Sequence, residues 1–209
     1  MIYLIGGPPR CGKTTLAKTL SQQAKIPWIS SDTLEVVAGE YMTQEEWDLT
    51  HPYSIAHTSN NTFYAEFTAK EIVTLIKAQS AATESAIHMT ALCSIKDEID
   101  YIIEGYHITP KFAAKLIKKY GVHNIKALFL VKTDAEKFVA EAVKNPVTND
   151  WLIKKDTKPE TIAKVGQMIV LYSNYFEAEA AKYKLPVFAM DKNFKKSISE
   201  IVKILGKKK

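Results

Sequence analysis

Residues 7–14 read GPPRCGKT and match the pattern G-x-x-x-x-G-K-[ST] in full. Glycines at the two ends of this loop let the backbone turn, so that successive N–H groups face phosphate oxygens. Lys13 can neutralise charge on the β- and γ-phosphates, and the Thr14 hydroxyl can hold magnesium. A glycine turn followed by a chance lysine is the alternative. The complete pattern favours binding of a nucleoside triphosphate such as ATP, together with Mg²⁺.

Nine consecutive residues are candidates for nucleotide binding. Among them, Cys11 is interpreted as a small residue tolerated beside phosphate, because phosphoryl transfer requires no thiol nucleophile. Two readings of Arg10 stay open, namely contact with a phosphate and exposure to solvent. The full set is Gly7, Pro8, Pro9, Arg10, Cys11, Gly12, Lys13, Thr14 and Thr15.

Two carboxylates that follow apolar runs are candidates for the chemistry of transfer. Asp32 could accept the proton of a substrate hydroxyl that attacks the γ-phosphate. Alternatively, Asp32 caps the next helix in a capping box with Glu35. Glu104 stands where an acid can orient magnesium, directly or through water, although an ordinary loop cap also fits. Gly105 beside it lets the chain approach a ligand closely.

Further side chains are candidates for the acceptor site and for a lid. Tyr106 and His107 either line an acceptor pocket or are packed residues of the core. The segment 145–159 breaks the periodicity, which is typical of a functional loop. Lysines there could close over the triphosphate, or they could form a solvated face. These lysines are Lys144, Lys154, Lys155 and Lys158.

Five short apolar runs predict β-strands that would position these residues, at 2–5, 27–30, 101–104, 125–131 and 186–190. The intervening sequence is helical in character, over about 43–100, 110–120, 134–144, 160–183 and the C-terminal residues. Within 43–100 an apolar stripe is expected at Phe63, Phe67, Ile72, Val73, Ile76, Leu92, Ile95 and Ile99. Strands that alternate with helices predict a parallel, doubly wound α/β sheet. Its ligands would bind beyond the carboxyl ends of the strands.

The length and composition are those of an ordinary globular chain. With 209 residues we expect one domain spanning 1–209, and 46% hydrophobic with 24% charged residues argues against disorder. No apolar run approaches the roughly 20 residues that span a bilayer. The N-terminal residues lack a signal-peptide pattern, so a cytoplasmic protein without membrane contact is expected. Cys11 and Cys93 lack C-x-x-C spacing, which disfavours a disulfide framework and structural zinc.

The charge balance bears on the class of partner. A net charge of +5 leaves room for an anionic partner, either a phosphorylated small molecule or a nucleic acid. Arg10 is the only arginine among 28 basic residues. Because arginine is the usual residue for base readout, sequence-specific nucleic acid binding is disfavoured.

Three segments together resemble small P-loop kinases: the phosphate loop with Thr15, residues 29–34 (ISSDTL) and residues 101–107 (YIIEGYH). The sequence is most similar to 2-phosphoglycerate kinase-like proteins, which residues 149–151 also resemble. More distantly it resembles zeta toxins, chloramphenicol phosphotransferases and adenylate kinases. The resemblance implies a three-layer P-loop NTPase fold with strand order 2-3-1-4-5, a base at Asp32 and an acid at Glu104. Adenylate kinases and zeta toxins place several arginines around the phosphates, whereas this chain has only Arg10.

From these residues we expect an ATP-dependent kinase that transfers the γ-phosphoryl group to a small metabolite, with a phosphorylated sugar acid as one candidate acceptor. Lys13, Asp32 and Glu104 would be catalytic, and Thr14 and Glu104 would hold Mg²⁺. Residues 43–100 would shape the acceptor site, and 145–159 would form a lid. A nucleotide-dependent regulatory protein and a zeta-toxin-like, nucleotide or polynucleotide kinase are the alternatives. The sequence predicts neither the acceptor, nor the preference for ATP over GTP, nor the oligomeric state.

Overall fold

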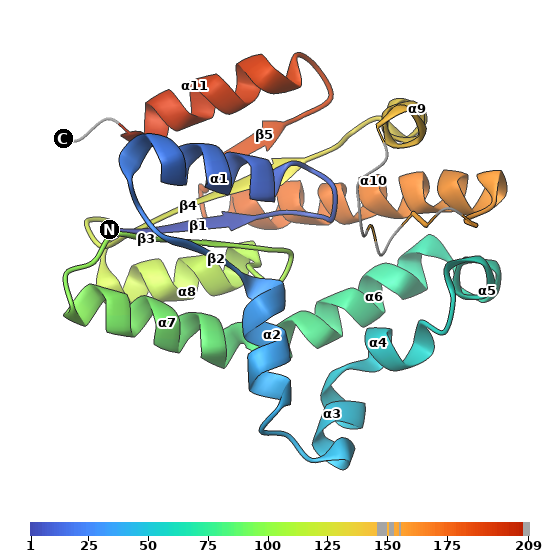
Figure 1. Cartoon of the computed structure of the whole chain (residues 1–209), viewed down its shortest axis with the longest axis horizontal. Helices are drawn as coiled ribbons and strands as arrows, with labels where there is room; N and C mark the ends of the chain where they lie inside the picture. The colour runs from blue at the N-terminus through green and yellow to red at the C-terminus, as the bar shows by residue number, and fades with distance from the viewer. Residues whose placement is uncertain (146–149, 151–152, 155, 207–209) are drawn as a thin grey trace.

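The protein is built on a five-stranded parallel β-sheet (Figure 1). The computed structural model describes residues 1–145, 150, 153–154 and 156–206. The strands are β1 (Ile2–Gly6), β2 (Trp28–Ser30), β3 (Tyr101–Glu104), β4 (Ile125–Val131) and β5 (Val187–Ala189). They lie in the order β2-β3-β1-β4-β5, and each neighbouring pair is parallel. The predicted fold class and strand order are therefore confirmed.

The register of the strands brings their carboxyl ends to one edge of the sheet. Glu104, the last residue of β3, pairs with Ile5 of β1 on one side and with Ser30 of β2 on the other. The segments that follow these three strands consequently begin side by side. This edge is where ligands of open α/β sheets bind.

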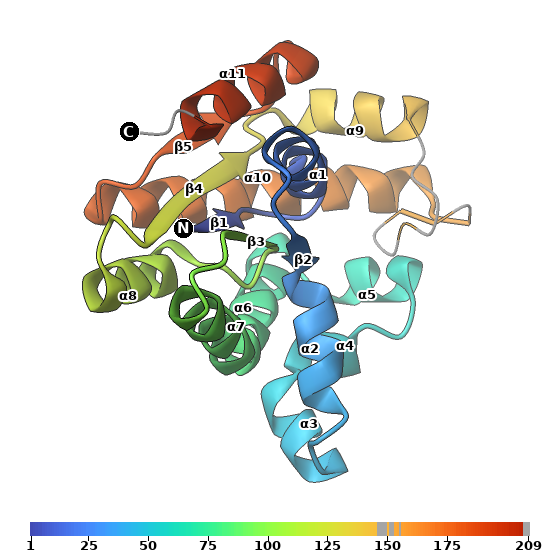
Figure 2. The ribbon, with the colours of Figure 1, turned by 60° about the vertical axis from the view of Figure 1, so that its left-hand side comes forward.

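Helices cover both faces of the sheet. α1 (Lys13–Ala24) and α11 (Phe194–Gly206) lie on one face, and α7 (Glu84–Lys96), α8 (Pro110–Tyr120) and α10 (Pro159–Lys182) lie on the other (Figure 2). α9 (Ala135–Lys144) follows β4 and packs against α10. Because both faces are covered, β1 is buried along its whole length, which explains its unbroken apolar sequence.

The chain between β2 and β3 is helical, as expected, but it divides into short helices. α2 (Ser31–Gly39) leads away from the sheet toward the helices that follow it (Figure 1). Thr43 and Thr68 begin two of those helices with capping boxes that include Glu46 and Glu71. These helices are α3 (Gln44–Thr50), α4 (Pro52–Ala56), α5 (Asn60–Glu66), α6 (Ala69–Ser80), a 3₁₀ turn (Ala81–Thr83) and α7.

The expected apolar stripe is confirmed in its first half, whereas in its second half Ile95 packs against the core only partly buried and Ile99 is exposed. Ile72, Val73 and Ile76 of α6 are buried. On α7 the buried residues are instead Ile87, Ala91 and Ser94, and Ile99 is exposed beyond the end of the helix. Leu92 and Ile95 are only partly buried. Small residues face the core here because α7 packs against β1 and β3.

Elements with clear terminal signals end where the sequence predicts. Thr109 caps α8 and Pro110 is its first residue, while Gly121 follows its last. Asp134 caps α9 by accepting a hydrogen bond from the N–H of Lys137. Among the helices within the described ranges, none is both long and apolar enough to cross a membrane.

Candidate functional site

The phosphate loop joins β1 to α1 and adopts the tight turns that its glycines permit. Gly7 has φ 130°, and a Cβ atom there would lie 2.0 Å from the carbonyl oxygen of Leu130. Gly12 is the N-cap of α1 and forms no side-chain capping hydrogen bond, and no acidic residue occupies the first turn. The N–H groups at this helix end are therefore left for an anion, which the helix dipole also favours.

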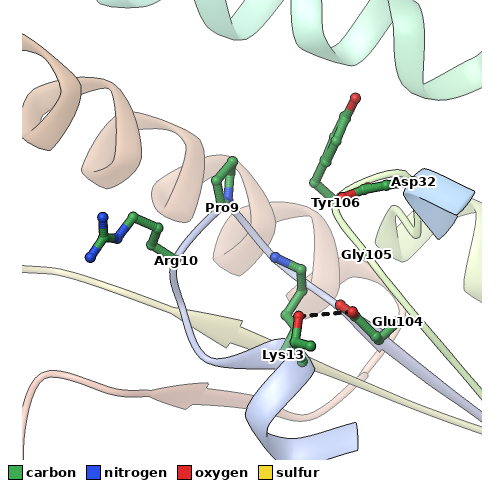
Figure 3. A pocket seen from close by; sticks show the side chains of 8 residues that line it. Pro9, Arg10, Lys13, Asp32, Glu104, Gly105 and Tyr106 are labelled. Atoms are coloured by element: carbon green, nitrogen blue, oxygen red, sulfur yellow. Dashed lines mark hydrogen bonds between the residues drawn. The ribbon is translucent and has the colours of Figure 1, made fainter. Parts of the chain in front are cut away.

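The Lys13 side chain folds back along the loop instead of extending into solvent. It is 7% exposed, and its Nζ donates a hydrogen bond of 2.7 Å to the carbonyl oxygen of Pro8. Figure 3 shows this ammonium group on the same side of the loop as the Glu104 carboxylate. A cation in this position can meet the oxygens of a bound polyphosphate.

Thr14 and Glu104 come together across the carboxyl ends of β1 and β3. The Thr14 hydroxyl donates a 2.8 Å hydrogen bond to Oε1 of Glu104, which is 3% exposed. Burial raises the pKa of the Glu104 carboxyl, and this effect is opposed by the charge of Lys13 and by the Thr14 hydrogen bond. The two side chains thus present hard oxygen ligands side by side.

Asp32 lies in the first turn of α2 and faces the same pocket (Figure 3). The helix is capped by Ser30, whose Oγ accepts a hydrogen bond from the N–H of Asp32. The alternative in which Asp32 itself caps the helix, with Glu35 in a capping box, is therefore wrong. Removal of water by the surrounding protein raises the pKa of Asp32, against the opposing charges of His107 and Lys13.

His107 is packed beneath Asp32 and does not line the pocket. Its side chain is fully buried, and its Nδ1 shares a 2.7 Å hydrogen bond with Oγ of Ser31. The same Nδ1 lies 3.6 Å from Oδ1 of Asp32, and Nε2 lies 3.1 Å from Oε1 of Glu35. Of the two readings of His107, the packed residue is the one observed. Its neighbours nonetheless place it between two carboxylates of the site.

Glu35 continues this buried polar cluster toward the helices between β2 and β3. Its Oε1 accepts a 2.9 Å hydrogen bond from Gln79 and lies 3.7 Å from Nε2 of His51. Burial alone would raise the pKa of Glu35, but hydrogen bonds from His107 and Gln79 outweigh it, and the pKa is lowered. Gln79 also contacts the Tyr106 hydroxyl at 3.4 Å. The cluster therefore connects the wall of the pocket to α6.

Sequence reasoning missed Gln79 and His51 as members of the site. Gln79 is 2% exposed and follows Ile72, Val73 and Ile76 at helical spacing, so a polar residue on a buried face was a usable signal. His51 carries no such signal, because it follows a short exposed helix and is buried only through the tertiary fold.

The pocket at this edge has a volume of about 450 Å³, including the open space at its mouth. It is lined by Pro9, Arg10, Lys13, Thr14, Asp32, Glu104, Gly105 and Tyr106. Of the nine predicted nucleotide-binding residues, five do not line it, namely Gly7, Pro8, Cys11, Gly12 and Thr15. Thr15 is exposed on α1, whereas Cys11 is fully buried behind the loop, and burial raises its thiol pKa to about 12. The protonated thiol fits the interpretation of Cys11 as a non-nucleophilic residue.

Arg10 lines the pocket and does not extend into solvent, and its contact with a phosphate stays a prediction. Its guanidinium forms an ion pair with Asp150, whose side chain is 6% exposed, and donates a 3.2 Å hydrogen bond to the carbonyl oxygen of Asn145. The only arginine of the chain therefore already has an acidic partner. Of residues 149–151, Asp150 alone lies within the described residues.

The described end of the predicted lid is attached to α5. Asn61 donates a hydrogen bond to the carbonyl oxygen of Asp156 and accepts one from the N–H of Lys158, both at 3.0 Å. Lys154 is exposed and does not line the pocket. Lys155 and residues 146–149 and 151–152 lie outside the described residues.

Comparisons with known proteins identify this architecture. Residues 3–103 match the model of the ATPase family associated with various cellular activities (AAA), a span that includes the phosphate loop and Asp32 and ends one residue before Glu104. No curated protein matches the sequence significantly.

Solved structures match nearly the whole chain. Shikimate kinase from Bacteroides thetaiotaomicron is 14% identical, with a TM-score of 0.53 and 98% of each chain covered. A protein from Chloroflexus aurantiacus that is described provisionally as a kinase is 12% identical, with a TM-score of 0.50 over 98% of this chain and 92% of that one. An uncharacterised protein from Eubacterium ventriosum is 15% identical, with a TM-score of 0.50 over 98% and 97%. The chain therefore has the α/β fold of the P-loop NTPases.

Proposed function

We propose that the protein is an ATP-dependent kinase that transfers the γ-phosphoryl group of ATP to a hydroxyl of a small molecule. The observation that carries this proposal is the convergence of Lys13, Thr14, Glu104 and Asp32 on one pocket at the carboxyl edge of the sheet. A phosphate loop alone would serve any nucleotide-binding protein. An additional carboxylate on the opposite wall is what a hydroxyl acceptor requires.

The phosphate loop, Lys13 and Asp32 have separate proposed roles. The backbone N–H groups of Gly7, of residues 10–13 and of the start of α1 hold the polyphosphate, since Pro8 and Pro9 have no N–H. Lys13 exchanges the carbonyl of Pro8 for phosphate oxygens. Asp32 orients the acceptor hydroxyl and accepts its proton as the oxygen attacks. The raised pKa of Asp32 makes it a stronger base than a fully solvated aspartate.

Magnesium fits the oxygen ligands of Thr14 and Glu104. No cluster of three or more acidic, histidine or cysteine ligands occurs in the part of the chain that the structure describes. Mg²⁺ is commonly held by one or two protein oxygens together with substrate phosphates and water, which matches this pair. When bound, the ion would neutralise charge on the β- and γ-phosphates.

We further propose that residues 43–100 form the acceptor side of the site within a single domain. Gln79 of α6 contacts both Glu35 and the Tyr106 hydroxyl, which connects this region to the pocket wall. A lid function for 145–159 remains a prediction. The phosphorylated sugar acid suggested by the family resemblance is one acceptor class to be tested.

The test is acceptor-dependent release of ADP by matched variants. Lys13→Ala should lower turnover by about 10²-fold or more, because it removes a charge aimed at the transferring phosphate. Lys118→Ala, an exposed lysine on α8, is the control and should have no effect. Full turnover in Lys13→Ala would overturn the assignment.

A second pair of variants isolates the proposed base. Asp32→Asn should bind ATP within about twofold of the wild type and lose about 10²-fold or more in turnover. Asp48→Asn, an exposed change on α3, provides the control. Wild-type turnover in Asp32→Asn would remove the base from the mechanism. ATP binding without transfer to any acceptor would indicate a regulatory nucleotide-binding protein.

A further inference from the structure

The acceptor side of the pocket is rich in negative charge. Asp32 and Glu104 line it, and Glu35 stands behind Asp32 with its side chain 13% exposed. Glu104 ends β3, and Asp32 and Glu35 follow the adjacent strand β2, whose last residue, Ser30, pairs with Glu104. An acceptor that enters the pocket therefore meets acidic groups first.

The two described basic side chains that line the pocket, Arg10 and Lys13, already contact other groups of the protein. Arg10 pairs with Asp150, and Lys13 lies on the phosphate side of the pocket, against the carbonyl of Pro8. Within the described ranges, no other lysine or arginine lines the pocket. Lys18 lies over the ring of Trp28, at 5.6 Å from its centroid.

The nearby histidines do not supply a free positive charge either. His107 is fully buried between Asp32 and Glu35, and His51 is 1% exposed with its Nε2 3.7 Å from Glu35. Both rings thus face carboxylates of the protein, and neither lines the pocket. In the part of the chain that the structure describes, the acceptor side thus lacks the arginine fork by which proteins usually hold a phosphate or carboxylate.

We propose that the acceptor is a polyhydroxylated compound that carries no phosphate or carboxylate group, either an uncharged polyol or a cationic amino sugar. This proposal rests on the proposed kinase function. Because Glu104 is assigned to Mg²⁺, the charges that would repel an anionic acceptor are those of Asp32 in the pocket wall and of Glu35 behind it. A hydroxyl or ammonium group can instead donate a hydrogen bond to Asp32.

The transfer step balances without a further reactant. The acceptor hydroxyl oxygen forms a bond to the γ-phosphorus, and the bond from that phosphorus to the β–γ bridging oxygen breaks. The hydroxyl proton passes to Asp32, and ADP leaves with the bridging oxygen. The products are ADP and a phosphate monoester of the polyol.

The experiment compares acceptors that differ in an anionic group, in the presence of ATP and Mg²⁺. Glycerol is compared with glycerate and with 3-phosphoglycerate, xylitol with xylonate, and glucosamine with gluconate. We expect kcat/KM for ADP release to be at least about tenfold higher with the uncharged or cationic member of a pair. Every assay is repeated with Lys13→Ala, which should abolish the release.

Glu35→Gln tests whether the negative charge of Glu35, behind Asp32, causes the preference for uncharged or cationic acceptors. The substitution keeps the shape and removes one negative charge. The ratio of kcat/KM for glucosamine to that for xylitol should fall about fivefold. An unchanged ratio would contradict the charge argument.

The outcomes separate the two proposals. Preference for the anionic members would overturn the acceptor inference and leave the kinase assignment intact. Lys13-dependent binding of ATP with no release by any acceptor would overturn the kinase assignment, and the acceptor inference with it. Preference for the uncharged or cationic members would support both.

Discussion

Gly105→Ala should destabilise the protein and disturb the start of α2. Gly105 follows β3 with φ 154°, and an added Cβ would lie 1.7 Å from Oγ of Ser31 and 2.8 Å from its Cβ. Neither contact is possible without movement. Ser31 hydrogen-bonds His107, so its displacement would also shift the residue beneath Asp32.

The magnitude follows from two separate costs. A non-glycine residue at a strained positive φ costs about 1–3 kcal/mol. An extra methyl group in a well-packed site costs a further 1–3 kcal/mol or so. A total of about 3 kcal/mol would lower Tm by roughly 6–12 °C for a chain of this length. Because folded domains are stable by about 5–15 kcal/mol, the variant should still fold.

Thermal unfolding of Gly105→Ala and of a control measures this prediction. In Gly121→Ala, where φ is 87°, the added methyl meets only the exposed His123 ring, so the conformational cost acts alone at about 1 kcal/mol. In a Ser31→Ala background, the destabilisation by Gly105→Ala should shrink, because the 1.7 Å contact is removed. A loss in Tm no larger than that of Gly121→Ala would refute the reasoning.

Three further predictions concern charged and thiol groups. Glu104→Gln should raise Tm at pH 7 and lower turnover about tenfold or more, because burial raises the folded-state pKa of Glu104 and its ionised form destabilises the fold. The Tm difference should vanish as the pH falls through that raised pKa, and a constant difference in pH-dependent melts would contradict this. Iodoacetamide at pH 8 should label Cys93 and spare Cys11, whose pKa is raised to about 12; mass spectrometry that finds Cys11 alkylated in the folded protein would oppose the buried placement. The double-mutant cycle of Arg10→Lys and Asp150→Asn, followed by urea unfolding, should give a coupling of about 0.5–3 kcal/mol, whereas additive effects would argue against the ion pair.

The strands were predictable because the sheet is covered on both faces. The bounds of β3 and β4 match the apolar runs at 101–104 and 125–131, since buried parallel strands contain few polar residues. The ends of α8 were equally clear from Thr109, Pro110 and Gly121. Local signals of this kind require no knowledge of the tertiary fold.

The helices between β2 and β3 show what hydrophobic periodicity cannot predict. A stripe of apolar residues indicates helix but does not locate the breaks, which occur here at caps such as Ser59 and Thr68. On α7, Ala91 and Ser94 are buried together with Ile87 where the helix packs against β1 and β3, and hydrophobicity alone does not predict burial of the alanine and the serine.

Some residues of the candidate site could likewise be predicted from the sequence, and others could not. The phosphate loop, Asp32 and Glu104 follow from motif and strand-end position, and the structure brings them into one pocket. The pairing of Arg10 with Asp150 joins residues 140 positions apart, and the contact of Gln79 with Glu35 spans 44. Such contacts depend on how the helices dock, so the sequence pattern could not supply them.

α10 has a mechanical consequence for the site. Ser173 on this helix accepts a 3.1 Å hydrogen bond from the N–H of Lys132, just beyond β4, and Lys164 donates a 2.7 Å bond to the carbonyl oxygen of Tyr64 in α5. With 24 residues the helix is about 36 Å long, so one stiff rod is fastened both to the sheet and to the helices opposite it. If the protein is the proposed kinase, this helix would hold the phosphate loop and the acceptor side at a nearly constant separation, so that acceptors would be selected by their length.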